Sequence, residues 1–497
     1  MSAHKEGRRI RLGLVSGDGL PVSGLLTIFK NIVDLGVRHG IADGRVAADL
    51  GYSWRPDKPG FFPAGDPGIT YPPWLTVTSW HPGRARRDPG AWGQLLTRIR
   101  RAAADGEAGT DLERAAREIE AEYHGHFLSW MTEHAIDWVV AVNMTLTDAV
   151  PVSRALASAA AQRFSGRPGG VLYWDHDLLG SCGIIDPGTG RRYYPAAPNL
   201  WTPIPAARRH NRWAVVSPGL RDEAEGYPTA LEPQLVPSIL PREPDAQLGQ
   251  RHYSFAGQQG LDLQAPVLLS PVRVFSVKGV EITLALAARL GQLLQARGER
   301  QPRLLVFGSL QEEPAYARRV VKAAADLGIG DQVRFLDGVP LASHRAADGA
   351  WRLDEIDLLA LASATGGAVL FTPSVQDVET IGLGPALAAL AGIPCAVTPY
   401  KAYDAFYRGA LSDVRAHPGE EGINAAAEEL LSLMAGRARR DPAVLSRLKS
   451  NHAALGDLFP VRPWLDLLQD LSSEFGRLPD GESPGGPGIP ETRRQAG

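Results

Sequence analysis

Residues 371–394 read FTPSVQDVETIGLGPALAALAGIP, and this stretch carries the pattern that decides the fold. An apolar run that predicts a buried strand leads into a loop that contains Glu379, and glycines then open a helix of small apolar residues. A Gly-Ile-Pro turn leads to the next apolar run. Such a strand-to-helix turn can aim backbone N–H groups and the positive helix end at an anion, as phosphate sites require, or it can be only a tight packing corner.

Alternating apolar runs and helical patterns extend on both sides of this stretch, which is typical of βα units stacked into parallel sheets. In the first half, the predicted strands are Ile10–Ser16, Arg45–Trp54, Leu75–Trp80, Trp138–Asn143, Val171–Trp174 and Trp213–Ser217. In the second half they are Val267–Val274, Arg303–Phe307, Gln332–Leu336, Ala368–Thr372 and Cys395–Thr398. The predicted fold class is therefore α/β.

The proline-rich segment Glu232–Gln250 interrupts the alternation and is interpreted as an extended connector between two domains. The predicted N-terminal domain is 1–235, and the predicted C-terminal domain is 236–460. A helix at 461–476 is expected to pack back on the first domain. The last residues, 477–497, have no core-forming pattern and are expected to be disordered.

Length and composition limit the function classes. A chain of 497 residues is longer than one hydrophobic core usually organises, which favours two domains. Its 52 basic and 55 acidic residues nearly cancel, so nucleic acid is not an expected partner. Without an apolar run near the ~20 residues of a bilayer span, and without a signal-type N-terminus, we expect a cytoplasmic protein with no membrane span. A homodimer remains open.

Cysteines, histidines and short motifs exclude further classes. Cys182 and Cys395 lie far apart, allow neither a disulfide framework nor a thiolate metal site, and are expected to be small buried side chains. The spacing of His124, His126 and His134 is not that of a helical zinc site, so no metal is expected there. The absence of G-x-S-x-G and of G-x-x-x-x-G-K-[ST] disfavours a serine hydrolase and a P-loop NTPase.

A second motif stands at the start of the second half, where residues 270–279 read SPVRVFSVKG. Arg273 offers a planar fork and Lys278 a point charge, and together they could neutralise a departing diphosphate. The alternative is a pair of solvated cations at the end of a strand. The glycine-rich turn downstream favours the first interpretation.

These two motifs, with the strand end FGS at 307–309 between them, resemble the retaining glycosyltransferases of family 4. The resemblance covers residues 265–400, and its three features occur in the family's order. It implies a GT-B fold, in which two Rossmann-like domains face each other and the second holds most of the nucleotide-sugar donor. It also implies that no metal or other cofactor is required.

Residue by residue, the resemblance makes Arg273 and Lys278 the diphosphate ligands and Glu379 the carboxylate near the donor sugar. The backbone contacts to the sugar and phosphate are implied for Ile381, Gly382 and Leu383. The sequence departs from the family at Leu387, where a second Glu normally binds the ribose hydroxyls. Three readings stay open: the donor carries deoxyribose, another side chain replaces the contact, or transferase activity is lost.

In the first half, two strand ends carry polar groups. Gly17 and Gly19 belong to the turn GDGLPVSG at 17–24, which resembles the glycine-rich turn by which such enzymes approach the donor phosphate and the acceptor. The strand at 170–174 ends in Asp175-His176-Asp177, at the edge of a parallel sheet where ligands bind. His176 is the candidate histidine for the donor sugar or acceptor, with a structural role as the alternative. Asp175 and Asp177 are candidates for acceptor hydroxyls or amines.

The resulting hypothesis is a retaining glycosyltransferase in which Glu379, His176, Arg273 and Lys278 carry catalysis. The donor would be a nucleoside diphosphate sugar, or a sugar-like cyclitol, and the acceptor a small polar molecule of secondary metabolism such as antibiotic biosynthesis. The alternatives are a pseudo-glycosyltransferase that couples an activated cyclitol to an amine, a non-catalytic nucleotide-sugar-binding protein, and a phosphorylase that uses pyridoxal phosphate.

Overall fold

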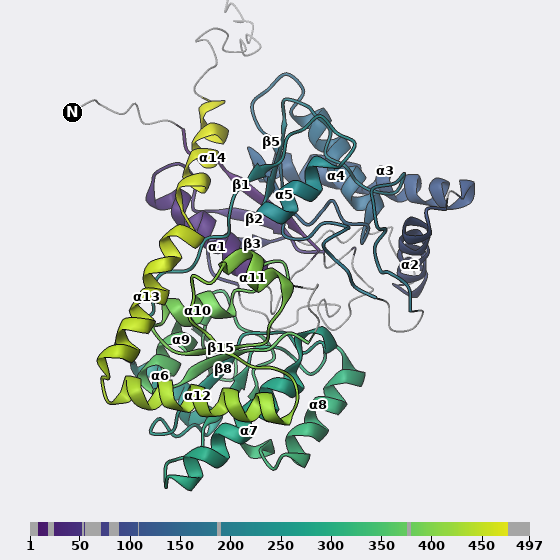
Figure 1. Cartoon of the computed structure of the whole chain (residues 1–497). Coiled ribbons are helices and arrows are strands. Elements are labelled where there is room, and N and C mark those ends of the chain that lie inside the picture. The colour runs from purple at the N-terminus through teal and green to yellow at the C-terminus, as the bar shows by residue number, and fades with distance from the viewer. Residues whose placement is uncertain are drawn as a thin grey trace, which may run out of the picture.

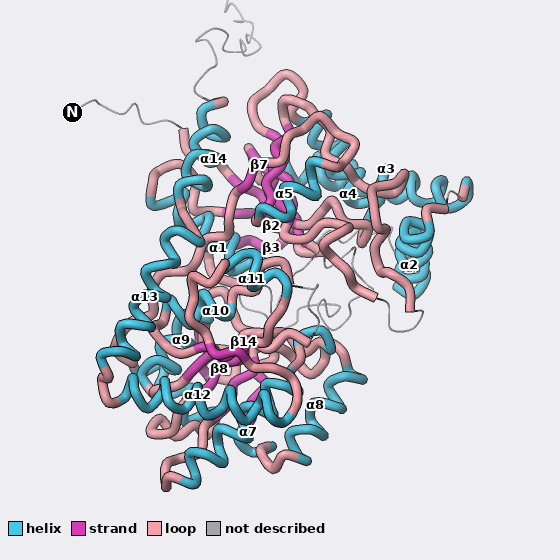
Figure 2. Tube along the Cα trace, in the orientation of Figure 1, coloured by secondary structure: helices cyan, strands magenta, loops and turns pink. Residues whose placement is uncertain are grey.

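The structure is a computed structural model that describes residues 8–17, 24–51, 54, 71–78, 89–107, 109–185, 190–374 and 379–475. The described chain forms two α/β units, which Figure 1 shows one above the other. Each unit has a parallel sheet with helices packed around it (Figure 2). The candidate residue Gly19 and the tail predicted to be disordered, 477–497, lie outside the described residues.

In the first unit, the described residues form a sheet of seven strands in the order β3-β2-β1-β4-β5-β6-β7, with all neighbours parallel. The strands are β1 (Leu12–Ser16), β2 (Val46–Asp49), β3 (Leu75–Val77), β4 (Trp138–Val142), β5 (Gly170–Asp175), β6 (Asn211–Val215) and β7 (Gln234–Leu235). Its helices are α1 (Gly24–Arg38), α2 (Pro89–Asp105), α3 (Thr110–Glu133), α4 (Val150–Arg163) and α5 (Pro218–Glu225).

In the second unit, the described residues form a parallel sheet of six strands in the order β10-β9-β8-β13-β14-β15. The strands are β8 (Val267–Ser270), β9 (Arg303–Val306), β10 (Val333–Phe335), β13 (Ala368–Phe371), β14 (Cys395–Val397) and β15 (Val414–Arg415). A separate hairpin pairs β11 (His344–Arg345) with β12 (Trp351–Arg352).

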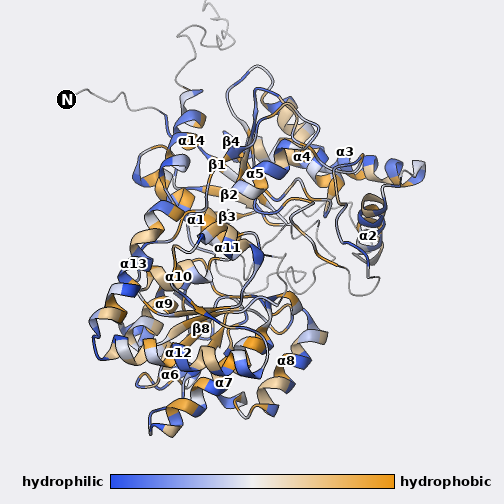
Figure 3. Cartoon of the chain, viewed as in Figure 1, coloured by the Kyte–Doolittle hydropathy of each residue, from blue (hydrophilic) through white to orange (hydrophobic). Residues whose placement is uncertain are grey.

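The helices of the second unit, with two short 3₁₀ turns, are α6 (Gln250–Gln259), η1 (Ser276–Lys278), α7 (Val280–Ala296), α8 (Pro314–Asp326), η2 (Gly330–Gln332), α9 (Glu355–Ala364), α10 (Gly384–Leu390), α11 (Lys401–Tyr407), α12 (Glu420–Ala438) and α13 (Pro442–Leu458). Figure 3 shows apolar residues concentrated on the sheets and polar residues on the outer helix faces. None of the described helices is long and apolar enough to cross a bilayer.

Strands β1, β4 and β5 are buried along their whole lengths, because helices cover both faces of the sheet. This explains why their sequences read as continuous apolar runs, such as WVVAV at Trp138–Val142, and do not alternate. Some predicted strands are longer than the strands in the structure. The run at 45–54 leaves the sheet after Asp49, and Gly51 then takes a φ of 79°, a turn conformation.

The last described helix, α14 (Arg462–Ser473), lies against the first unit although it follows the second in sequence (Figure 1). Trp464 is fully buried, donates from Nε1 to the Pro237 carbonyl at 2.9 Å, and packs edge-on against Trp174 of β5. Nε1 of Trp138 in β4 donates to the carbonyl oxygen of Leu471 at 3.2 Å. The chain therefore passes between the two units twice.

The two cysteines are buried, as the sequence predicts, with Cys182 in the first unit and Cys395 in β14. Burial raises the pKa of the Cys395 thiol well above its usual value. The Cys395 side chain is therefore not placed to act as a thiolate nucleophile.

Candidate active site at the strand ends

The strand orders mark one position in each sheet where the direction of chain progression reverses. These positions lie between β1 and β4 in the first sheet and between β8 and β13 in the second. In open parallel sheets, ligands bind outside the carboxyl ends of the strands at such reversals. The loops that follow these four strands contain the sequence-predicted residues Gly17, Arg273, Lys278 and Glu379.

The Lys278–Glu379 ion pair joins the loop after β8 to the loop after β13. Ser374 holds the two loops together, because its Oγ donates to the Ser276 carbonyl at 2.7 Å and its N–H to the Val277 carbonyl at 3.1 Å. The two charged side chains are only 22% and 11% exposed. The structure therefore brings together two residues that lie 101 positions apart.

A glycine makes this approach possible. Gly279, between η1 and α7, has a φ of 58°, and a Cβ there would overlap the Thr372 carbonyl of the loop after β13. Only glycine fits both the left-handed backbone and the close contact.

Arg273 is also paired with a carboxylate. Its Nε donates to Glu312 Oε2 at 2.7 Å, and its guanidinium lies 4.4 Å from the centre of the Phe275 ring. The Glu312 side chain is 4% exposed and accepts a second hydrogen bond, from the Ser309 N–H at 2.9 Å. Glu312 was not predicted from the sequence, although its position three residues after the FGS strand end was a usable signal.

The glycine turn after Glu379 is supported by two buried tyrosines. The Tyr400 hydroxyl donates to the Ile381 carbonyl at 2.8 Å, and the Tyr407 hydroxyl donates to the Gly382 carbonyl at 2.7 Å. Gly382 has a φ of 71°, a backbone conformation that favours glycine. The two tyrosines were not predicted, because no local pattern signals a contact made from α11 and its N-cap.

In the first unit, Asn143 organises the loop after β5. It adopts a φ of 52°, and its Oδ1 accepts hydrogen bonds from the N–H groups of His176 at 2.8 Å and Asp177 at 3.3 Å. Its Nδ2 donates to Asp177 Oδ2 at 3.0 Å. His176 is 8% exposed, with its ring 4.3 Å from that of Trp174. Asn143, at the reversal position beside β4, is a further residue that was not predicted from the sequence.

A hydrogen bond connects the loop that carries Glu379 to Asp177, a predicted residue of the first unit. Thr380, directly after Glu379, donates from Oγ1 to Asp177 Oδ1 at 2.8 Å. A continuous series of polar contacts therefore runs from Lys278 through the Glu379–Thr380 backbone to Asp177 and on to Asn143. These residues come from the carboxyl ends of four parallel strands.

No protein-family model matches the sequence, and no curated protein matches it. Solved structures do match. Sucrose-phosphate synthase from Thermosynechococcus elongatus covers 94% of this chain over 100% of its own length, at 15% identity and a TM-score of 0.56. WaaG, a glycosyltransferase involved in lipopolysaccharide biosynthesis, covers 93% over 99% of its own length, at 16% identity and a TM-score of 0.51. Anabaena HepE in complex with UDP and glucose covers 95% over 100%, at 15% identity and a TM-score of 0.51.

The chain has the GT-B fold. The two parallel sheets and their helices confirm the predicted fold class. The GT-B fold also accounts for the position of the candidate residues, because the strand ends of both units contribute to the Thr380–Asp177 contact.

One candidate residue of the GT-B chain is not placed as the sequence predicts. Asp175 is fully buried, and its Oδ2 accepts a hydrogen bond from Trp213 Nε1 at 2.8 Å. Burial raises the pKa of Asp175 to about 7, and the hydrogen bond from Trp213 offsets only part of that effect. This placement does not fit an acceptor ligand; it fits a structural carboxyl group that joins β5 to β6.

Three other candidates lie near the reversal positions with different exposures. Gly17 follows β1 in a half-buried bend. Leu383 is half-buried at the N-cap of α10. Leu387, at the position where the family's ribose-binding Glu is expected, is 3% exposed inside α10 and packs in the core. The GT-B chain thus has an apolar side chain where that resemblance implies a carboxylate.

The histidines of α3 do not gather at one place. His124 lies within hydrogen-bonding distance of Ser158 and Gln162 on α4. His126, whose side chain is 8% exposed, pairs with Asp49 at the end of β2, with 2.9 Å between Nε2 and Oδ2. This pair belongs to the same edge of the first sheet as Asn143.

Proposed function

We propose that this GT-B chain is a retaining glycosyltransferase that moves a sugar, or a sugar-like cyclitol, from a nucleoside diphosphate to a small polar acceptor. The observation that carries the proposal is the Lys278–Glu379 pair at the reversal of the second sheet, connected through Thr380 to Asp177 of the first. The fold supports it, as does the similarity to HepE, whose structure is a complex with UDP and glucose.

In this proposal, Lys278 and Arg273 bind the diphosphate and stabilise the charge that grows on it as the sugar leaves. Each cation is held by a glutamate, Glu379 or Glu312, before the donor binds. The glutamates fix the positions of the cations, and the diphosphate oxygens then compete for them. Two cations with a helix N-terminus supply the positive charge, so the reaction requires no metal ion.

The acceptor attacks the anomeric carbon on the face that the diphosphate leaves, within a short-lived oxocarbenium-like ion pair. The bond to the diphosphate oxygen breaks, the bond to the acceptor oxygen forms, and the acceptor proton passes to the departing diphosphate. The configuration at the anomeric carbon is therefore retained. His176 and Asp177 stand on the acceptor side, where His176 contacts the donor sugar or the acceptor.

The donor nucleotide is the feature of this proposal that the chain constrains most. The buried Leu387 side chain cannot accept hydrogen bonds from the ribose hydroxyls. A deoxyribose nucleotide has one hydroxyl fewer, so it loses less hydrogen-bonding free energy on binding than a ribonucleotide does. We therefore propose a deoxythymidine diphosphate sugar as the preferred donor. The acceptor is proposed to be a metabolite of secondary metabolism in the cytoplasm.

Calorimetric titration of the full chain with deoxythymidine, uridine and guanosine diphosphates tests the donor site. We expect binding to the wild type and a loss of at least about tenfold in affinity in Lys278→Gln, because a charged hydrogen-bond partner is removed. Arg318→Gln, an exposed arginine on α8, is the matched control. Equal affinities in wild type and Lys278→Gln would refute the proposed donor site.

A further inference from the structure

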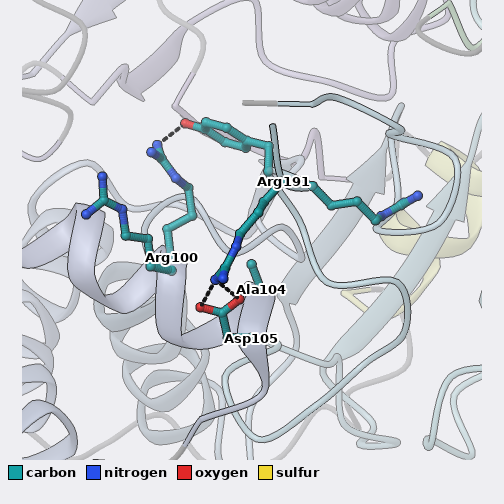
Figure 4. A pocket seen from close by; sticks show the side chains of 7 residues that line it. Arg100, Ala104, Asp105 and Arg191 are labelled. Carbon is teal, nitrogen blue, oxygen red and sulfur yellow. Dashed lines mark hydrogen bonds and ion pairs between the residues drawn. The ribbon is translucent and has the colours of Figure 1, made fainter. Parts of the chain in front are cut away.

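A pocket of about 230 Å³ lies in the first unit, between α2 and the segment 191–193 (Figure 4). Its lining contains four arginines, one acid and one phenol: Arg100, Arg101, Arg191, Arg192, Asp105 and Tyr193. None of these residues belongs to the site described above. With four guanidinium groups against one carboxylate, the described residues of the lining carry a net charge of about +3, since arginine stays protonated.

Two interactions orient the lining. Arg191 forms an ion pair with Asp105, with 3.1 Å between Nη1 and Oδ1. Arg100 lies over the Tyr193 ring, 3.8 Å from its centre, and also hydrogen-bonds the Tyr193 hydroxyl. Figure 4 shows Arg191 reaching toward Asp105 at the end of α2, with Arg100 earlier on the same helix. The guanidinium groups of Arg100 and Arg191 are thus each held by another residue of the lining.

The pocket adjoins the loop that carries His176 and Asp177. Arg192, which lines it, donates from Nη2 to the carbonyl oxygen of Leu179 at 3.2 Å, and Leu179 follows Asp177 by two residues. The backbone N–H of Tyr193 donates to the Ile184 carbonyl at 2.8 Å, which fixes the segment beside that loop. A ligand group in the pocket therefore belongs to a molecule that approaches from the acceptor side.

We propose that this pocket binds an anionic group of the acceptor: a phosphate, a sulfate or a carboxylate. Arginine forks bind such oxyanions in a bidentate manner, and the net positive lining favours them over neutral groups. The volume is below the roughly 300 Å³ of a site that encloses a whole small ligand, so the pocket holds one group of a larger molecule. The role of that molecule as acceptor rests on the proposed glycosyltransferase function.

Calorimetry on the full chain tests the pocket with glucose 6-phosphate and glucuronate, and with glucose as the uncharged control. The titrations are made in the Arg273→Gln/Lys278→Gln background, so that the proposed diphosphate site does not contribute. We expect at least one anionic sugar to bind about tenfold more tightly than glucose. Further substitution of Arg100→Gln/Arg191→Gln should abolish this difference, whereas Arg318→Gln on α8 should leave it unchanged.

Asp105→Asn gives a result in the opposite direction, which a folding defect would not produce. Removal of the acid that competes for Arg191 should tighten anion binding several-fold. Equal binding of all three sugars, or equal losses in the pocket variant and the Arg318→Gln control, would overturn the proposal. Failure of nucleoside diphosphates to bind the wild type would instead refute the donor site, and the two results are measured separately.

Discussion

Two positions at the carboxyl ends of the strands, one in each sheet, use different chemistry to hold neighbouring loops together. In the second sheet, the loops after β8 and β13 meet through full charges, Lys278 with Glu379 and, nearby, Arg273 with Glu312. In the first sheet, the loops after β4 and β5 meet through Asn143, which hydrogen-bonds the backbone of His176 and Asp177. Fixed cations suit a ligand with concentrated negative charge, whereas a hydrogen-bonded polar loop suits a hydroxyl-rich ligand.

The carboxylates of the two positions differ in the same way. Glu379 is partly exposed and paired with a cation, while Asp175 is fully buried beside an indole N–H. A buried acid without a cation is held closer to neutrality, as the raised pKa of Asp175 indicates. Proximity to a strand end therefore does not make a carboxylate part of a ligand site.

The strongest test of this contrast removes the cations of the second sheet. Lys278→Ala and Arg273→Ala should each lower turnover by at least ~100-fold with the fold intact, because each stabilises charge that develops as the diphosphate leaves. Turnover and the thermal midpoint should be measured together, with Arg318→Ala as the control. Near-normal turnover in both variants would contradict the assignment of the donor site.

A smaller effect is expected at Leu387 in α10, where the resemblance to the family implies a carboxylate. Leu387→Glu should shift nucleotide preference from the deoxy form towards uridine or guanosine diphosphates, by about 1–3 kcal/mol for one paired ribose hydroxyl. Calorimetric titration of each nucleotide measures the shift. Because Leu387 is 3% exposed, Leu387→Gln is the control that separates burial of a polar group from the effect of the carboxylate. A wild type that binds the ribonucleotide far more tightly would refute the deoxyribose hypothesis.

In the first sheet, His176→Ala should lower turnover or sugar selectivity by about tenfold, the effect of one lost hydrogen bond to a charged or transition-state group. Nucleoside diphosphate affinity should change little, because the cations that bind it belong to the other unit. Kinetics with two donor sugars, together with calorimetry, separate these effects. A fall in nucleotide affinity alone would reassign His176 to the donor side.

The smallest effect on turnover is expected for Asp175→Asn. This substitution should instead change how the unfolding free energy depends on pH. The folded-state pKa of about 7 lies above the unfolded value of 3.8, so the folded state binds the proton more tightly. Protonation of Asp175 therefore adds to the unfolding free energy. This added stability is fully present below about pH 4 and is lost as the pH rises to about 7. Urea titrations across this range should show a steeper fall in the wild type than in the variant. Parallel pH profiles would refute the buried, protonated role of Asp175.

Several features of the site could be read from local sequence because they depend on neighbours along the chain. The α/β fold class followed from the alternating βα patterns, and the resemblance of three motifs in a fixed order implied the GT-B fold, which the solved structures confirm. The motif with Lys278 and the motif with Glu379 were both found, each at the end of an apolar run. The domain boundaries and the roles of the site residues stay predictions.

Residues that act through tertiary contacts could not be found in this way. Tyr400, Tyr407 and Asn143 support the predicted residues from other segments, and nothing in their local sequence names their partners. For Glu312, only its position after the FGS strand end was a signal. The burial of Asp175 was likewise invisible, since a strand end alone does not say whether a side chain points to solvent or to the next strand.

Hydrophobic periodicity and glycine positions are local properties, and they were enough to predict two parallel sheets and the turns that follow their strands. Which charges meet is a property of packing, because Lys278 and Glu379 are 101 residues apart and come together only when β8 and β13 lie side by side. The same holds for the arginine pocket, where α2 and the segment 191–193 are far apart in the chain. Tertiary packing, which short-range preferences do not encode, brings together the residues of the Lys278–Glu379 pair and those of the arginine pocket.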